Sequence, residues 1–299
     1  MTEGATGSGA TGSTVPRRQL GRYLRDLRNK PCLTIRAAAE ALEWSETKIW
    51  RIETGHTSMR SLDVETMCRI YGAPVDTTEA LMALAKETKA RGWWLSYSDV
   101  LPEGFDVYLG LEEAAARLQS YQSELIPGLL QTEPYARTMI QAGTPGLSEA
   151  EIERRVQVRI QRQALLGRVT SPPELNVVLN EAILRRPVGG AKLMAAQLAH
   201  LLEMAELVTV TVKVMPFDAG MHHGIVARPF VMLDFPTNSN GTPTEPPVVY
   251  MEGFTGELYL DKAHEVDQYS GAFTDLWSAS LDEATSRSLI ADTVKELGE

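Results

Sequence analysis

The sequence predicts an α+β protein of two domains: an all-α N-terminal domain of five short helices, followed by an α+β domain with a small sheet. Between residues 17 and 90, apolar residues recur with the three-to-four-residue spacing of amphipathic helices. Segments rich in β-branched residues first appear at residue 174 and alternate with helical segments. A chain of 299 residues is also longer than one hydrophobic core usually spans.

The composition is that of a soluble protein, with 43% hydrophobic and 23% charged residues. No apolar run approaches the roughly 18 residues that a membrane-spanning helix needs. Residues 1–15 are rich in Gly, Thr and Ser and lack the pattern of a signal peptide, so we expect a disordered tail. Cys32 and Cys68 provide neither a disulfide framework nor zinc-ligand spacing. We therefore expect a cytoplasmic protein without a membrane segment.

The charge of the chain is unevenly distributed. The formal net charge is −10, yet residues 16–60 contain ten basic and five acidic side chains. The chain after residue 60 contains nineteen basic and thirty-three acidic side chains. A basic segment on an acidic protein is expected when one small domain contacts phosphate and the remainder does not.

The first predicted helix covers residues 17–30, "RRQLGRYLRDLRNK". Its apolar stripe consists of Leu20, Tyr23, Leu24 and Leu27, at the i, i+3, i+4 and i+7 positions of an amphipathic helix. Prolines precede and follow this segment, as expected at a helix start and stop.

Two short helices follow, separated by three residues. Thr34 is the predicted N-cap of "IRAAAEAL", and Ser45 is the predicted N-cap of "ETKIWRIE". In the latter helix Ile49 and Ile52 face inward, and Gly55 terminates it. A fourth helix is predicted from Ser61 to "YGAP", and a fifth from 77 onward through "EALMALAKETKARG". This arrangement is the helix-turn-helix plan.

The segment "LTIRAAAEALEWSETKIWRIETG", residues 33–55, resembles the repressor-type helix-turn-helix of the Xre family. The resemblance implies that the third helix enters the major groove of DNA. It further implies a structural ion pair between Arg28 and Glu53. The residues that it places at the bases are Glu46, Thr47 and Arg51. Those that it places beside phosphates are Ser45, Lys48 and Thr54.

The chemistry of the three base-facing residues agrees with this role. The Arg51 guanidinium can donate two parallel hydrogen bonds to guanine, Thr47 can contact thymine, and Glu46 can accept from cytosine. Lys48 and Arg36 are interpreted as phosphate contacts, which position a protein without reading sequence. The alternative interpretation of the whole segment is a purely structural helical bundle.

Two positions depart from the family pattern. The family usually opens its second helix with a phosphate-binding glutamine, where this chain has Ile35, and Arg36 can replace that contact. Trp50 occupies a position where a small or polar residue is usual. Two interpretations of Trp50 stay open: packing against the rest of the protein, or a flanking contact with a thymine methyl group or a sugar.

The second domain begins with an aromatic-rich segment and an Ala/Leu-rich helix. A charged helix follows, with Ser148 and Glu151 as a capping box. A later helix follows the Gly-Gly turn of "RRPVGG", and two helices close the chain. The predicted strands are 174–180, 208–217, 228–235 and 247–254, with a polar hairpin loop at 237–247 between the last two.

Five blocks of this half resemble the C-terminal domain of antitoxin-like regulators of actinobacterial type. They are "RGWWLSYSDVLPEGFDVYLGLE", "YQSELIPGLLQTEPYAR", "NEAILRRPVGG", "VMPFDAGMHHG" and "VVYMEGFTGELYL". The resemblance implies a transcription factor, often encoded beside a small partner protein that it binds. It does not specify a ligand for the domain itself.

The sequence gives little support for an enzyme. Adjacent histidines, His222 and His223, can bind a metal or transfer protons, but no other group has metal-ligand spacing. Motifs of hydrolases, nucleotide-binding loops and metalloproteases are lacking. We expect no catalytic residue, no metal and no cofactor. The aromatic residues at 93–108 line a groove or, as the favoured alternative, attach the linker to the second domain.

The sequence therefore predicts a tail (1–15), a DNA-binding domain (16–75), a linker (76–106) and a regulatory domain (107–299). We expect a regulator, for instance a repressor, that binds double-stranded operator DNA as a homodimer. Two alternatives are an antitoxin-like protein whose main role is to bind a small protein encoded nearby, and a regulator gated by a small-molecule effector.

Overall fold

The computed structural model describes residues 14–87, 93–102, 104–169, 171–237, 241–253 and 256–298. The chain forms two compact units that divide after Leu111. The first unit is helical, and the second combines helices with a single sheet. The predicted α+β class is therefore confirmed.

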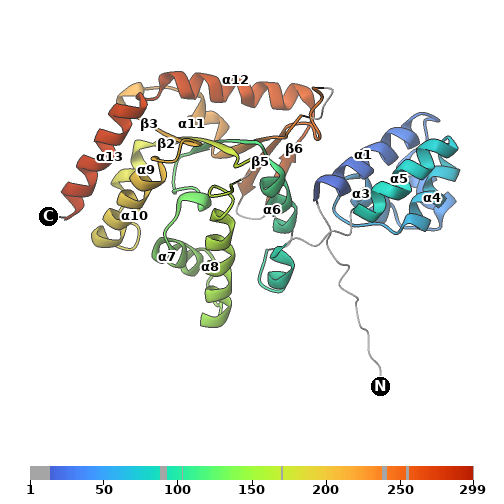
Figure 1. The fold of residues 1–299 in the computed structure, drawn as a ribbon, viewed down its shortest axis with the longest axis horizontal. Helices are drawn as coiled ribbons and strands as arrows, with labels where there is room; N and C mark the ends of the chain where they lie inside the picture. The colour runs from blue at the N-terminus through green and yellow to red at the C-terminus, as the bar shows by residue number, and fades with distance from the viewer. Residues whose placement is uncertain are drawn as a thin grey trace. The chain divides into compact units, whose positions relative to one another are not determined.

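The first unit contains the five predicted helices (Figure 1). They are α1 (Thr14–Asn29), α2 (Ile35–Leu42), α3 (Glu46–Glu53), α4 (Ser61–Ile70) and α5 (Val75–Glu87). Helix α1 starts at Thr14, so the last two residues assigned to the tail are helical, and residues 1–13 lie outside the described range. Helix α5 starts two residues before its predicted beginning, and the end predicted for it lies in 88–92, outside the described residues.

Local capping explains the limits of α2 and α3. The Thr34 hydroxyl accepts a hydrogen bond from the Ala37 N–H at 3.1 Å, and the Ser45 hydroxyl accepts one from the Lys48 N–H at 3.2 Å. Each hydroxyl satisfies a backbone donor that the first turn of a helix leaves without a partner. Gly55 follows α3 with a φ of +78°, a conformation that glycine adopts without strain. Both predicted caps are confirmed.

The core of the first unit lies between the inner faces of the five helices. It includes Leu20, Leu24 and Leu27 of α1, together with Ile49 and Ile52 of α3, all of them buried. The inclusion of Tyr23 in the apolar stripe is wrong, because its side chain is 49% exposed. Its phenol ring lies at the edge of the stripe, where the hydroxyl can stay hydrated.

The segment after α5 packs its aromatic rings on one another. It contains a 3₁₀ helix, η1 (Trp93–Tyr97), and α6 (Phe105–Ala114), which spans the division between the units. The Trp93 ring contacts Trp94 and Tyr97 edge-on, and the Phe105 ring stacks on Tyr108 at 5.6 Å. These contacts pack the rings on one another within the segment, and the attachment of the linker to the second domain stays a prediction.

The second unit is built on one six-stranded sheet. The strands are β1 (Arg117–Gln122), β2 (Glu174–Asn180), β3 (Val210–Met215), β4 (Phe230–Asp234), β5 (Val248–Gly253) and β6 (Gly256–Leu260). Their order is β3-β2-β1-β4-β5-β6. The first three strands are parallel, and β4, β5 and β6 are joined to β1 and to one another in antiparallel pairs.

The four predicted strands exist, although three of them are shorter than predicted. The polar loop at 237–247 does connect the antiparallel strands β4 and β5, and its residues 238–240 lie outside the described range. Two strands were missed. The more important is β1, a central strand. It lies where the Ala/Leu-rich sequence favours the continuation of a helix. Pairing with β2 and β4 overrides that local preference.

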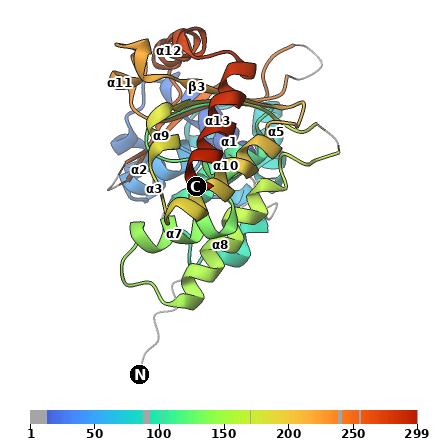
Figure 2. The same cartoon turned by 90° about the vertical axis from the view of Figure 1, so that its left-hand side faces the viewer.

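In the described part of the second unit, nine helical segments follow α6. They are η2 (Gly128–Leu130), α7 (Glu133–Gly143), α8 (Glu149–Gln163), α9 (Glu181–Arg185), α10 (Ala191–Met204), η3 (Phe217–Ala219), α11 (His223–Ala227), α12 (Ala263–Ala279) and α13 (Glu283–Gly298). Helix α12 lies along one face of the sheet, with α7, α8 and α10 on the opposite side (Figure 1). Helices α10 and α13 pack against each other (Figure 2).

Polar side chains, of which Gln197 is buried and Gln163 half-buried, hold the turn "IPGLLQT", residues 126–132, against the helices. The Gln197 amide donates to the Leu130 carbonyl at 2.7 Å and accepts from the Thr132 N–H at 2.7 Å. The Gln163 amide donates to the Gln131 carbonyl at 2.6 Å. Since buried backbone groups must be hydrogen-bonded, these glutamines let an irregular turn lie inside the unit. This motif therefore has a structural role.

Candidate nucleic-acid interface

Helix α3 presents one exposed face and one buried face. Glu46, Thr47 and Arg51 are exposed, whereas Ile49 and Ile52 on the opposite face belong to the core. Among the described residues, the side chains of Glu46, Thr47 and Arg51 form no hydrogen bond or ion pair with the protein. Their donors and acceptors are therefore available to an external ligand. The structure brings the three predicted base-contacting residues onto one helix face.

Two of the predicted phosphate contacts lie at the start of α3. The Lys48 Nζ lies 3.4 Å from the centre of the Trp44 ring, in a cation–π contact. The Ser45 hydroxyl accepts the capping hydrogen bond and keeps its own hydrogen for another acceptor. Lys48 is thus a cation held beside the helix N-terminus, where backbone N–H groups also attract anions.

The other predicted phosphate contacts already have partners within the protein. Arg36 is exposed and forms an ion pair with Glu40, one turn later on α2, at 3.1 Å. A pair so exposed is weak and screened by salt, so Arg36 can exchange it for a phosphate. The Thr54 hydroxyl donates to the Trp50 carbonyl at 2.7 Å and lies 2.8 Å from His56 Nδ1. Its hydrogen-bonding capacity is therefore largely used.

Trp50 is neither buried in the core nor fully free. Its ring stacks on the His56 ring, with the ring centres 5.1 Å apart, and its side chain is 48% exposed. Burial lowers the pKa of His56, with further lowering from Arg18, so this ring is neutral near pH 7. One face of Trp50 is packed by the protein, and the remainder stays accessible beside Arg51.

The ion pair expected between Arg28 and Glu53 forms in the interior of the unit. Arg28 Nε lies 2.6 Å from Glu53 Oε1, and Arg28 Nη2 lies 2.8 Å from Glu53 Oε2. The remaining guanidinium nitrogen, Nη1, donates to the Leu33 carbonyl at 2.6 Å. Both side chains are buried, and the hydrogen bonds to Glu53 raise the pKa of Arg28. One side chain thus joins α1, the start of α2 and the end of α3.

Two glycines position α3: Gly21, which the sequence analysis missed, and Gly55, which it predicted only as the end of the helix. A Cβ on Gly21 of α1 would lie 2.5 Å from the Ile52 carbonyl oxygen of α3. A Cβ on Gly55 would lie 2.6 Å from the Arg18 Cγ. The backbone of α3 and of the residues after it therefore lies directly against α1. The available signal was an isolated glycine inside an otherwise regular amphipathic pattern, which often marks a close approach.

The histidine pair of the second unit lies at the start of α11. Burial, with a further contribution from His223, lowers the pKa of His222, and His223 Nδ1 lies 3.1 Å from an oxygen of Asp275. Within the described part of the chain, no three His, Cys, Asp or Glu side chains come together in a way that could hold a metal ion.

No described helix is both long and apolar enough to span a membrane.

Comparison with known protein families gives two matches. Residues 19–81 match the family described as helix-turn-helix domain, and residues 105–292 match the family described as domain of unknown function (DUF5753). No curated protein and no solved structure matches the chain. The first match covers α2, α3 and the turn between them, and it identifies the first unit as a helix-turn-helix DNA-binding domain.

Proposed function

Because this chain belongs to the DUF5753 family and carries a helix-turn-helix DNA-binding domain, we propose that it is a sequence-specific transcriptional regulator of Xre type. In this proposal α3 lies in the major groove of operator DNA. The observation that carries the proposal is the exposed row of Glu46, Thr47 and Arg51 on a helix whose other face is locked into the core. The basic character of residues 16–60 favours the approach to phosphate.

We further propose that the protein acts as a homodimer. A single helix-turn-helix module contacts few base pairs, and two modules related by a two-fold axis read a palindrome with half-sites about one helical turn apart. In this proposal the α+β unit performs no catalysis and binds an effector or a partner.

The competing function is that of an antitoxin-like protein of actinobacterial type. It rests on the resemblance of the five sequence blocks in the second half, and it assigns the α+β unit to a small protein encoded nearby. Co-purification from the native host distinguishes the two. A stoichiometric small protein that releases the regulator from DNA favours the antitoxin-like role, and its absence favours a stand-alone regulator.

Arg51→Ala should weaken binding to the preferred operator about 5- to 150-fold, because a good bidentate base contact contributes ~1–3 kcal/mol of discrimination. The operator is first identified by selection from randomised duplex DNA, and affinity is then measured by titration at two salt concentrations. Lys48→Ala should instead weaken binding to all sequences alike and flatten the salt dependence.

Arg69→Ala is the charge-matched control, because Arg69 is an exposed arginine of the same unit at the end of α4. This variant should bind with a preference unchanged from the parent protein. Wild-type affinity and sequence preference in both the Arg51 and the Lys48 variants would show that α3 is not the recognition helix.

A further inference from the structure

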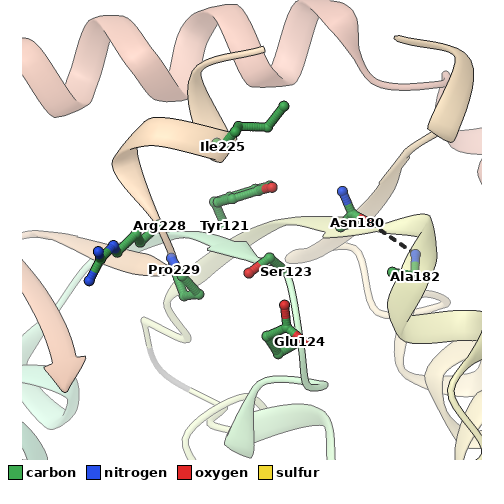
Figure 3. Close-up of a pocket in the computed structure, with 9 residues that line it drawn as sticks. Tyr121, Ser123, Glu124, Asn180, Ala182, Ile225, Arg228 and Pro229 are labelled. Carbon is green, nitrogen blue, oxygen red and sulfur yellow. Dashed lines mark hydrogen bonds between the residues drawn. The ribbon is translucent and has the colours of Figure 1, made fainter. Parts of the chain in front are cut away.

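The second unit contains a pocket at the carboxyl ends of two parallel strands (Figure 3). Its volume is about 270 Å³. Tyr121, at the end of β1, is joined by Ser123 and Glu124 just after that strand, and Asn180 closes β2. The third wall is the segment 224–229, which leads from α11 into β4.

The topology of the sheet places this pocket at the carboxyl ends of the parallel strands β1 and β2. From β1 the chain passes to β2 and then to β3, always toward the same edge of the sheet. The next strand, β4, instead lies on the other side of β1 and begins beside its end, with Phe230 opposite Tyr121. The chain therefore returns to the sheet beside the carboxyl end of β1. In open α/β sheets, a crevice outside the carboxyl ends of parallel strands is the usual place for a ligand.

The charges around the pocket favour an anion. The Glu124 carboxylate lies 2.5 Å from Arg186 Nη1, which neutralises it. Arg228, at one side of the pocket, is exposed and has no carboxylate partner among the described residues. With Glu124 neutralised by Arg186, which lies outside the lining, Arg228 remains as an uncompensated cation at the rim of the pocket, and its side chain extends away from Asn180 (Figure 3).

The inner wall offers neutral hydrogen-bonding groups. The Asn180 Oδ1 accepts a hydrogen bond from the Ala182 N–H at 2.9 Å (Figure 3). Burial raises the pKa of Tyr121, which therefore stays neutral. The Ser123 hydroxyl has no hydrogen-bond partner among the described residues and lies near the Tyr121 ring (Figure 3). It remains free to bind a polar ligand.

Arg228 occupies a backbone conformation that is almost restricted to glycine. Its φ is +61° and its ψ is 179°, and its N–H bonds to the Gly224 carbonyl at 3.2 Å. Such a conformation costs an arginine about 1–3 kcal/mol, which the surrounding structure must offset. Because backbone strain is often retained at functional sites, the strained backbone of this charged residue supports a role for its side chain in binding.

We propose that this pocket binds a small organic anion, a carboxylate or a phosphate monoester. The exposed Arg228 side chain turns toward the pocket to pair with the anionic group, and the neutral polar part of the ligand meets Ser123 and Asn180. A cavity of about 270 Å³ lies just below the usual ~300–1,000 Å³ of ligand pockets, so the ligand is a small metabolite. In the proposed regulator, this anion is the effector; that role rests on the proposed function, whereas the binding itself does not.

The test is calorimetric titration of the full-length protein, without DNA, with 2-oxoglutarate and with glycerol 3-phosphate as probes. Glycerol is the neutral control. We expect saturable binding of at least one anion and no binding of glycerol. A response to one anion alone assigns the ligand as carboxylate or as phosphate monoester.

Arg228→Gly is the decisive variant, because glycine tolerates the backbone conformation at this position and the fold should survive. Its melting temperature should equal or exceed that of the parent, while its affinity for the anion falls about tenfold or more, as expected for loss of a charge-assisted contact. The control is Arg117→Ala, which removes an exposed arginine at the opposite end of β1 and should leave the affinity unchanged. Ser123→Ala should weaken binding by a smaller factor.

Undiminished anion affinity in Arg228→Gly would overturn the proposal, and so would the failure of both anions to bind the parent protein. Equal binding of glycerol would do the same, since the charge would then play no part. A protein that binds the anion but no operator would contradict the proposed regulator and still confirm the pocket.

Discussion

Glu53→Ala should lower the free energy of unfolding of the helix-turn-helix unit by about 3–5 kcal/mol, the cost of removing one partner from a buried ion pair. The variant leaves the Arg28 guanidinium buried without its carboxylate, at the point where α1, α2 and α3 meet. Chemical denaturation followed by circular dichroism measures the change. DNA binding should be lost over the same range of denaturant, because α3 depends on this pair for its position.

The matched control is Glu46→Ala, which removes an exposed carboxylate from the first turn of the same helix and should change stability by much less. The double variant Arg28→Met with Glu53→Leu should recover most of the lost stability. An apolar pair of similar volume buries no charge, so no desolvation cost has to be offset by an ion pair. A loss below about 1 kcal/mol in Glu53→Ala would mean that the carboxylate is solvated in solution and that the pair is not buried there.

Gly21→Ala should destabilise the same unit by about 2 kcal/mol or more, although alanine is the better helix former by roughly 1 kcal/mol. The added methyl group would lie 2.5 Å from the Ile52 carbonyl oxygen, which is backbone and cannot rotate away. Helix α3 must therefore shift from α1. Melting curves and operator titration of the variant measure the two consequences, loss of stability and loss of affinity.

Gly271→Ala is the control, since Gly271 lies inside α12 and a Cβ there would meet no atom within 4 Å. Its substitution should stabilise the second unit by about 0.5–1 kcal/mol. The changes in the free energy of unfolding caused by the two substitutions are therefore expected to have opposite signs. A stabilising effect of Gly21→Ala would contradict the close approach of α1 and α3.

Local signals were sufficient to predict the first unit. Thr34 and Ser45 cap their helices through contacts three residues away, and Ile49 and Ile52 follow the spacing of one helix face. The exposed face of α3 then follows by geometry alone. Tyr23 was predicted to be buried because it fits the helical spacing. For a tyrosine at the edge of an apolar stripe, however, the spacing does not determine whether the side chain is buried or exposed.

The second unit was predicted less completely because its contacts are not local. Strand β1, "RLQSYQ", has the composition of a helix and becomes a strand only through β2 and β4. The pocket combines residues 121–124, 180–182 and 224–229, which no spacing rule relates. Arg228 gave no sign in the sequence that its backbone adopts a glycine-like conformation.

The position of β1 also bears on the order in which the units fold during synthesis. The helices of the first unit join near neighbours in the chain, and domains with such local contacts fold within microseconds to milliseconds. Strand β1 instead leaves the ribosome well before either neighbour, and its Arg117 pairs with Asp234, 117 residues later. We expect a nascent chain whose helix-turn-helix is complete while the strand edges of β1 are still exposed to chaperones or to aggregation.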